Sequence, residues 1–169
     1  MNQSKFLDVI NAIELPIIRL IQKICFAPYT SFIWDICSKL GAPGKIRYLP
    51  LFLYCLGFQE KAYLLSLSFV YFGFFSSIGK HLIKRRRPGS YDNIFNPKNS
   101  TSSSFPSKHT ICVSVASSFF PLTNLWIILV VLARINLGRH FVSDCVVGVL
   151  IGKLSVYLAP IITDPNFCV

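Results

Sequence analysis

The chain has 169 residues, of which 53% are hydrophobic and 14% are charged, and its mean hydropathy is +0.54. A soluble domain of this size carries about 25% charged residues, so the composition excludes an ordinary soluble domain and favours an integral membrane protein. The formal net charge is +10. Much of it lies in one block, residues 80–87, which favours binding of anionic headgroups or a phosphate ester. No helix-turn-helix, zinc-finger or single-strand-binding pattern is present, so we expect no nucleic acid partner.

The N-terminal region, residues 1–45, is predicted to lie at the membrane surface. Residues 5–24 alternate apolar and charged positions at helical spacing. They carry Asp8, Glu14, Arg19 and Lys23, which are too many charges for a spanning helix. An amphipathic helix in the interface is therefore expected. A second short helix is expected over 29–40, before the turn at 41–44.

Residues 46–162 are predicted to form the catalytic helical core of a single domain, 1–169. The apolar run 48–58 is short, whereas 62–79 is long and apolar enough for a membrane helix. Further apolar helices are expected over 111–120, 125–132 and 141–162, the last carrying Gly148 and Gly152 as a close-packing face. The fold class expected is an all-α membrane bundle of about five to six membrane helices with an amphipathic N-terminal helix.

The basic block directly follows the predicted membrane helix 62–79. We expect that helix to continue through the block until Pro88 ends it. Lys80, Lys84 and Arg87 would then lie on one helix face, because they are spaced four and three residues apart.

A second polar stretch, residues 133–144, lies between two apolar runs and contains His140 and Asp144. Charged residues are costly at such a place and usually mark a site. A carboxylate hydrogen-bonded to one imidazole nitrogen fixes the tautomer and leaves the other nitrogen free to attack an electrophile. The alternative is a solvated pair at a helix end with no catalytic role.

Three polar stretches should meet on one side of the membrane, because 111–120 and 125–132 form a hairpin between 106–109 and 134–144. The pocket would suit a phosphate, since arginines match its oxygens bidentately and a helix start binds anions. The sequence has no Asp/Glu cluster to hold a divalent ion, so we expect no metal and no cofactor. The phosphate ligands expected are Lys80, Arg87, Ser107 and Arg134, with Lys84 and Arg139 as possible additions.

The pattern resembles the three signature motifs of the type-2 phosphatidic acid phosphatase family, whose anion pocket soluble vanadium haloperoxidases share. The motifs are Lys80-x6-Arg87-Pro88, Pro106-Ser107-x-His109 and Arg134-x5-His140-x3-Asp144. The resemblance implies a metal-independent hydrolase in which His140 is the nucleophile that forms a phosphohistidine. It also implies that Asp144 orients His140, that His109 is the general acid and then the base, and that the remaining motif cations and Ser107 hold the phosphate.

Two positions depart from the family pattern. Lys108 replaces the usual Gly, and Ala133 replaces the usual Ser before the third-motif arginine. Lys108 keeps its backbone N–H and adds a cation at the rim, so we expect it to bind the substrate headgroup beyond the scissile phosphate.

The function expected is hydrolysis of a membrane lipid phosphate or diphosphate. Polyprenyl diphosphate, phosphatidic acid, phosphatidylglycerol phosphate and lipid A phosphate all remain candidates, and no feature fixes an oligomeric state. The alternative is a non-catalytic membrane protein that binds anionic lipid or phosphate, while membrane helices disfavour a haloperoxidase. The positive-inside rule would place the basic block in the cytoplasm. The resemblance instead implies a site on the extracytoplasmic face of a bacterial inner membrane.

Overall fold

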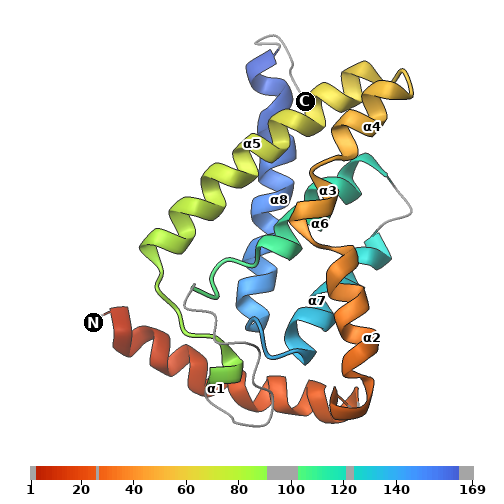
Figure 1. Cartoon of the computed structure of the whole chain (residues 1–169). Coiled ribbons are helices and arrows are strands. Elements are labelled where there is room, and N and C mark those ends of the chain that lie inside the picture. The colour runs from red at the N-terminus through yellow and green to blue at the C-terminus, as the bar shows by residue number, and fades with distance from the viewer. Residues whose placement is uncertain (1–2, 26, 91–102, 121–123, 164–169) are drawn as a thin grey trace.

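A computed structural model describes residues 3–25, 27–90, 103–120 and 124–163. The described part is helical, without strands, which confirms the predicted all-α membrane bundle (Figure 1). The α-helices are α1 (Gln3–Ile24), α2 (Ala27–Leu40), α3 (Pro43–Ile46), α4 (Leu49–Cys55), α5 (Gln59–Leu82), α6 (Lys108–Phe119), α7 (Asn124–Asn136) and α8 (Val142–Thr163), and a 3-10 turn, η1, covers Pro88–Ser90.

Two helices of the described part, α5 and α8, are long and apolar enough to cross a bilayer. α7 is apolar but has only 13 residues, short of the roughly 20 that a span needs. The predicted helices 29–40, 62–79, 125–132 and 141–162 correspond to α2, α5, α7 and α8. The connection between the predicted helices 111–120 and 125–132 lies largely outside the described residues.

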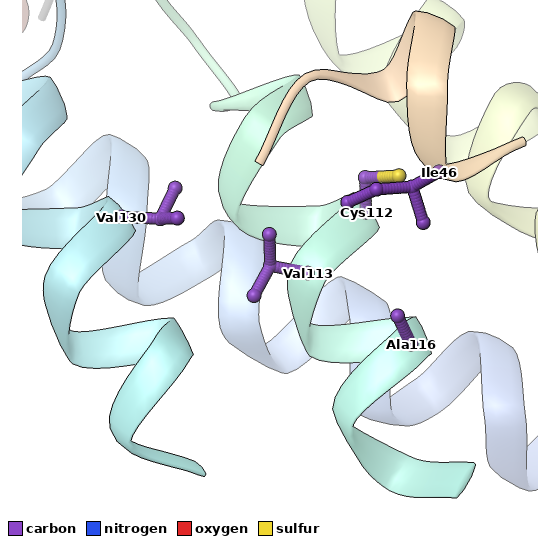
Figure 2. Packing of buried hydrophobic residues seen from close by; sticks show 5 residues of the cluster. All are labelled: Ile46, Cys112, Val113, Ala116 and Val130. Carbon is purple, nitrogen blue, oxygen red and sulfur yellow. The ribbon is translucent and has the colours of Figure 1, made fainter. Parts of the chain in front are cut away.

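The short helix α6 lies inside the bundle, where it packs against α5, α7 and α8. Every residue from 110 to 117 is buried, so this part of α6 has no exposed face and no amphipathic pattern. Figure 2 shows one part of this core, in which residues of α3, α6 and α7 form a cluster of Ile46, Cys112, Val113, Ala116 and Val130. α6 thereby gives a rigid support to the residues at its N-terminal end.

Gly148 and Gly152 let α8 approach α6 closely, as the sequence predicts. A Cβ at Gly152 would lie 2.6 Å from the Ser114 Cβ and 2.8 Å from the Ile111 carbonyl oxygen. The Ser114 hydroxyl donates to the Val149 carbonyl at 3.0 Å, which joins the two helices. Small residues serve helix pairs in membranes in this way.

Helix α1 runs across one end of the bundle, crosswise to α8 (Figure 1). Its inner face buries Asn11, Glu14 and Ile18. Its outer face exposes a stripe of large apolar side chains at helical spacing: Phe6, Val9, Ile13, Ile17, Leu20 and Ile24. A helix with polar groups toward the protein and apolar groups outward suits the apolar edge of a membrane. The predicted amphipathic N-terminal helix is therefore confirmed.

The expected helical continuation through the basic block is wrong. α5 ends at Leu82, and Ile83 is extended. Residues 83–87 run beside 103–105: the Ser104 N–H donates to the Arg85 carbonyl at 2.9 Å, and the Ser103 hydroxyl donates to the Ile83 carbonyl at 2.6 Å. In an extended chain side chains alternate in direction, so Lys84 does not share a face with Arg87 as it would in a helix.

Candidate active site

Backbone hydrogen bonds bring the three predicted motifs together. The Ser107 N–H, at the start of α6, donates to the Asp144 carbonyl in the first turn of α8 at 3.2 Å. The Gly89 N–H donates to the Gly138 carbonyl at 2.9 Å, which joins the chain after α5 to the loop before α8. Gly138 has φ +60°, a conformation that glycine adopts without strain. The predicted convergence of the segments is therefore present.

Asp144 occupies the third position of α8 and is fully buried. Its Oδ2 accepts the Phe141 N–H at 2.9 Å, as the acidic residue of a capping box does. Its Oδ1 accepts a hydrogen bond from Nη1 of Arg85 at 2.7 Å. A carboxylate at a helix N-terminus is also favoured by the helix dipole. These contacts fix both the charge and the orientation of Asp144.

His140 lies just before α8 and is 2% exposed. Its Nδ1 faces Asp144 Oδ2 at 3.7 Å, which is within ion-pair range but longer than a hydrogen bond. Burial lowers the pKa of His140 to about 4, although the neighbouring Asp144 acts in the opposite direction. The imidazole is thus neutral near pH 7, as a nucleophile requires.

The predicted phosphate-binding cations surround this pair. Lys80, in the last turn of α5, donates to the Ser103 carbonyl at 2.6 Å. Arg134, in the last turn of α7, is buried and donates through Nη1 to the Ser38 hydroxyl at 2.8 Å. Within the described residues its Nε has no hydrogen-bond partner. An arginine so buried, with a donor unused, is suited to an anion.

Arg87 is half-buried in the extended segment after α5. Burial lowers the pKa of Arg87, and the charge of Arg139 adds to this effect. Arg139 itself pairs with Asp35 of α2 at 3.4 Å. Several positive charges held at short range without equal negative charge favour the binding of an anion.

The start of α6 supplies the remaining predicted residues. Ser107 is fully buried and caps α6, and its Oγ also accepts the Thr110 hydroxyl at 2.9 Å. The Ser107 N–H donates to the Asp144 carbonyl, so this backbone donor is not available to an anion, while Ser107 as a phosphate ligand remains a prediction. His109 is partly buried, and burial, followed by the positive charge of Arg134 and the nearby His140, lowers the pKa of His109 well below the usual value of an imidazole. Lys108 is exposed, as expected of a rim residue.

Four polar residues near the site were not predicted from the sequence. Arg85 is 4% exposed and contacts the Asp144 carboxylate directly, although its place in a basic run indicated a headgroup contact. Glu14 pairs with Arg85, Ser38 with Arg134 and Asp35 with Arg139. The last three belong to the region 1–45. The proposed boundary at residue 45 remains a prediction, but side chains from before it contact the site.

Comparisons with known proteins agree with the overall fold. The crystal structure of LpxE from Aquifex aeolicus is similar with a TM-score of 0.74 and 22% identity, over 88% of this chain and 94% of that one. That of the first transmembrane PAP2 type phosphatidylglycerolphosphate phosphatase from Bacillus subtilis has a TM-score of 0.68 and 20% identity, over 99% of this chain and 100% of that one. No curated protein matches.

A family model described as the PAP2 superfamily matches residues 61–168, which is more than half of the chain. The matched range includes residues 80–87, 106–109 and 134–144, the three segments that the fold brings together. The chain therefore belongs to the PAP2 superfamily.

Proposed function

We propose that the protein is a metal-independent phosphohydrolase that removes phosphate from a membrane lipid phosphate or diphosphate through a phosphohistidine on His140. The observation that carries the proposal is the buried, neutral His140 beside the fixed Asp144 carboxylate, within a group of cations at the end of membrane helices. A lipid headgroup at this place could enter the site while its chains stay in the bilayer.

In the first step, Nε2 of His140 attacks phosphorus and forms a P–N bond while the P–O bond to the lipid breaks. The negative charge of a bound phosphate offsets the neighbouring cations and raises the pKa of His109, so that His109 can donate a proton to the leaving oxygen. As positive charge develops on the ring, the 3.7 Å separation between Nδ1 and Asp144 Oδ2 shortens, and Asp144 accepts a hydrogen bond from Nδ1 that stabilises this charge. Lys80, Arg87 and Arg134 stabilise the charge on the transferring phosphoryl oxygens.

In the second step, water attacks the phosphohistidine, and His109, now neutral, takes a proton from it. The P–N bond breaks, the electron pair returns to His140, and inorganic phosphate leaves. Each imidazole reverses its own role in the second step: His140 is first the nucleophile and then the leaving group, and His109 is first the acid and then the base. No further titratable group is needed.

We propose that neither step uses a metal ion or cofactor. The carboxylates near the site are committed to cations: Asp144 and Glu14 to Arg85, and Asp35 to Lys39 and Arg139. Phosphate release from a panel of lipid phosphates in detergent is therefore expected to be unchanged by excess EDTA. The control is the same panel with added magnesium. A strict magnesium requirement would contradict the mechanism, and binding without turnover of every lipid would favour the non-catalytic alternative.

The substrate class is a phosphorylated membrane lipid. The solved structures with this fold include a protein named phosphatidylglycerolphosphate phosphatase, which supports a lipid phosphate here without choosing the lipid. Polyprenyl diphosphate, phosphatidic acid, phosphatidylglycerol phosphate and lipid A phosphate remain the candidates for the panel.

Lys108 is proposed to contact the headgroup beyond the scissile phosphate. Lys108→Gly is expected to keep the chemistry but to lose several-fold in preference for a lipid diphosphate over a monophosphate. At a partly solvated rim an opposite charge contributes on the order of 1 kcal/mol. The measurement is the ratio of kcat/KM on the two substrates for both proteins, with Lys45→Gly, at an exposed lysine outside the three motifs, as control. An equal ratio in Lys108→Gly and wild type would exclude this contact.

We propose that the site faces the extracytoplasmic side of a bacterial inner membrane. The resemblance of the motifs supports this side, and both solved structures reported above are bacterial. A Lys84→Cys variant should react with a membrane-impermeant maleimide on intact cells, over the background of the native cysteines. Reaction only after the cells are opened would reverse the orientation.

A further inference from the structure

We propose that Arg85, held by Glu14 of α1, is a positioning residue that orients the Asp144 carboxylate toward His140; this inference rests on the proposed function. Arg85 does not belong to the three motifs from which the catalytic roles are drawn. It lies in the extended segment after α5, between the anion-facing Arg87 and the end of the helix.

Arg85 is 4% exposed, and the N–H groups of its guanidinium donate to residues of two helices. Toward α8, Nη1 donates to Asp144 Oδ1 and to the Ser143 hydroxyl, both at 2.7 Å. Toward α1, Nε donates to Asn11 Oδ1 at 2.9 Å, and Nη2 pairs with Glu14. An arginine with its donors so occupied has no free edge for substrate, so its effect on catalysis must pass through Asp144.

The N-terminus of α8 brings two buried carboxylates together. Besides Asp144, Glu14 reaches this end of the helix, where its Oε1 accepts the Ser143 N–H at 2.8 Å. Two carboxylates in one buried place cannot both stay ionised unless a cation lies between them. Arg85 is that cation, and its guanidinium also lies 3.8 Å from the centre of the Phe141 ring, which keeps it in place.

The geometry of Asp144 shows what this achieves. Arg85 holds Oδ1, and the Phe141 N–H holds Oδ2, so the carboxylate cannot rotate. In this orientation Oδ2 is the oxygen that faces His140. Removal of Arg85 would free the carboxylate and leave a buried charge without its partner. A lysine could supply the charge but not the planar set of donors that reaches both helices.

The test compares Arg85→Met, Arg85→Lys and Glu14→Gln with Arg86→Met. The control removes the same charge one residue away, from a side chain that is exposed. Arg85→Met should lower kcat about 100-fold, the size expected for a misplaced catalytic group, while KM changes by less than about threefold. Arg85→Lys should recover part of this loss. Arg86→Met should behave as wild type, and inhibition by inorganic phosphate should be unchanged in all four.

A second readout separates positioning from general loss of structure. The chain has three histidines, so 15N-histidine labelling gives three ring systems whose titration can be followed in detergent. His140 is faced from the surrounding elements by Asp144, Arg134, Arg87, Arg139 and His109, with Glu14 acting through Arg85 and Asp35 through Arg139. Arg85→Met removes positive charge and frees Asp144, so the pKa of His140 should rise. Glu14→Gln removes negative charge and leaves Arg85 to Asp144 alone, so that pKa should fall.

The inference would be supported if the pKa of His140 rises in Arg85→Met and falls in Glu14→Gln, and if kcat falls only in the Arg85 and Glu14 variants. Equal kcat in Arg85→Met and Arg86→Met, or shifts of one sign, would overturn it. If Arg85→Met does not fold, the kcat of Arg85→Lys, which keeps the charge, should still lie below that of Arg86→Met, and the pKa of His140 in Glu14→Gln should still fall; failure of either result would overturn the inference. If the wild type hydrolyses no lipid phosphate, the proposed function fails, while the histidine titrations still test the Arg85 contact with Asp144.

Discussion

Replacement of His140 by Asn is expected to lower kcat on any lipid phosphate by about 10⁴-fold or more, because nothing else in the site can form the covalent bond to phosphorus. Losses of this size follow removal of a nucleophile whose partners act with it as one unit. KM should change little, because Lys80, Arg87 and Arg134 still bind the phosphate. The measurement is kcat for purified protein in detergent, with thermal unfolding as a check of folding.

The matched control is His81→Asn, which makes the same change at an exposed histidine at the end of α5. It should retain wild-type kcat, which would show that loss of a histidine near the basic segment is not itself harmful. His140→Asn with more than about one hundredth of wild-type activity would contradict the nucleophile assignment, since an asparagine amide cannot replace an imidazole in this reaction.

Replacement of His109 by Asn should have the second largest effect, and its size should depend on the leaving group. General acid catalysis contributes about 10²–10⁴-fold. A lipid monophosphate expels an alkoxide, which is a strong base and needs the proton. A lipid diphosphate expels a lipid phosphate, a much weaker base. Formation of the phosphohistidine should therefore fall far more for the monophosphate than for the diphosphate.

Single-turnover kinetics on both substrates measure this step separately from hydrolysis of the intermediate. With the diphosphate, His109→Asn should form phosphoenzyme at a rate close to wild type and then release phosphate slowly, because no base activates water. The same His81→Asn variant serves as control. An equal loss of the first step on both substrates would mean that His109 is not the acid.

The spacing of the motifs predicted which segments meet. His140 and Asp144 could be paired from the sequence because four residues across a helix start place two side chains on one face. The apolar run 111–120 predicted the helix that the structure shows as α6, and Gly148 and Gly152 predicted a close-packing face on α8. Each of these signals is local, so the sequence alone contains it.

The contacts made over long distances in sequence could not be predicted in this way. Glu14 and Arg85 are 71 residues apart, and Ser38 and Arg134 are 96 apart. The sequence predicts a headgroup contact for Arg85, because a basic run next to a membrane helix favours anionic headgroups. Only the pairing of 83–87 with 103–105 makes the chain extended there and turns Arg85 toward Asp144. Nothing in the local sequence distinguishes the buried Arg85, which lies between two carboxylates, from the other three basic residues of its run.

The most direct test of the phosphohistidine mechanism is to trap the intermediate. The protein is mixed with a lipid diphosphate carrying radioactive terminal phosphate, quenched in alkali within milliseconds, and digested for mass spectrometry. The account predicts label that is stable in alkali and labile in acid, on the peptide that contains His140. The label should be more abundant in His109→Asn and absent in His140→Asn. Label on His109 would contradict the account. So would turnover without any labelled protein in both the wild type and His109→Asn.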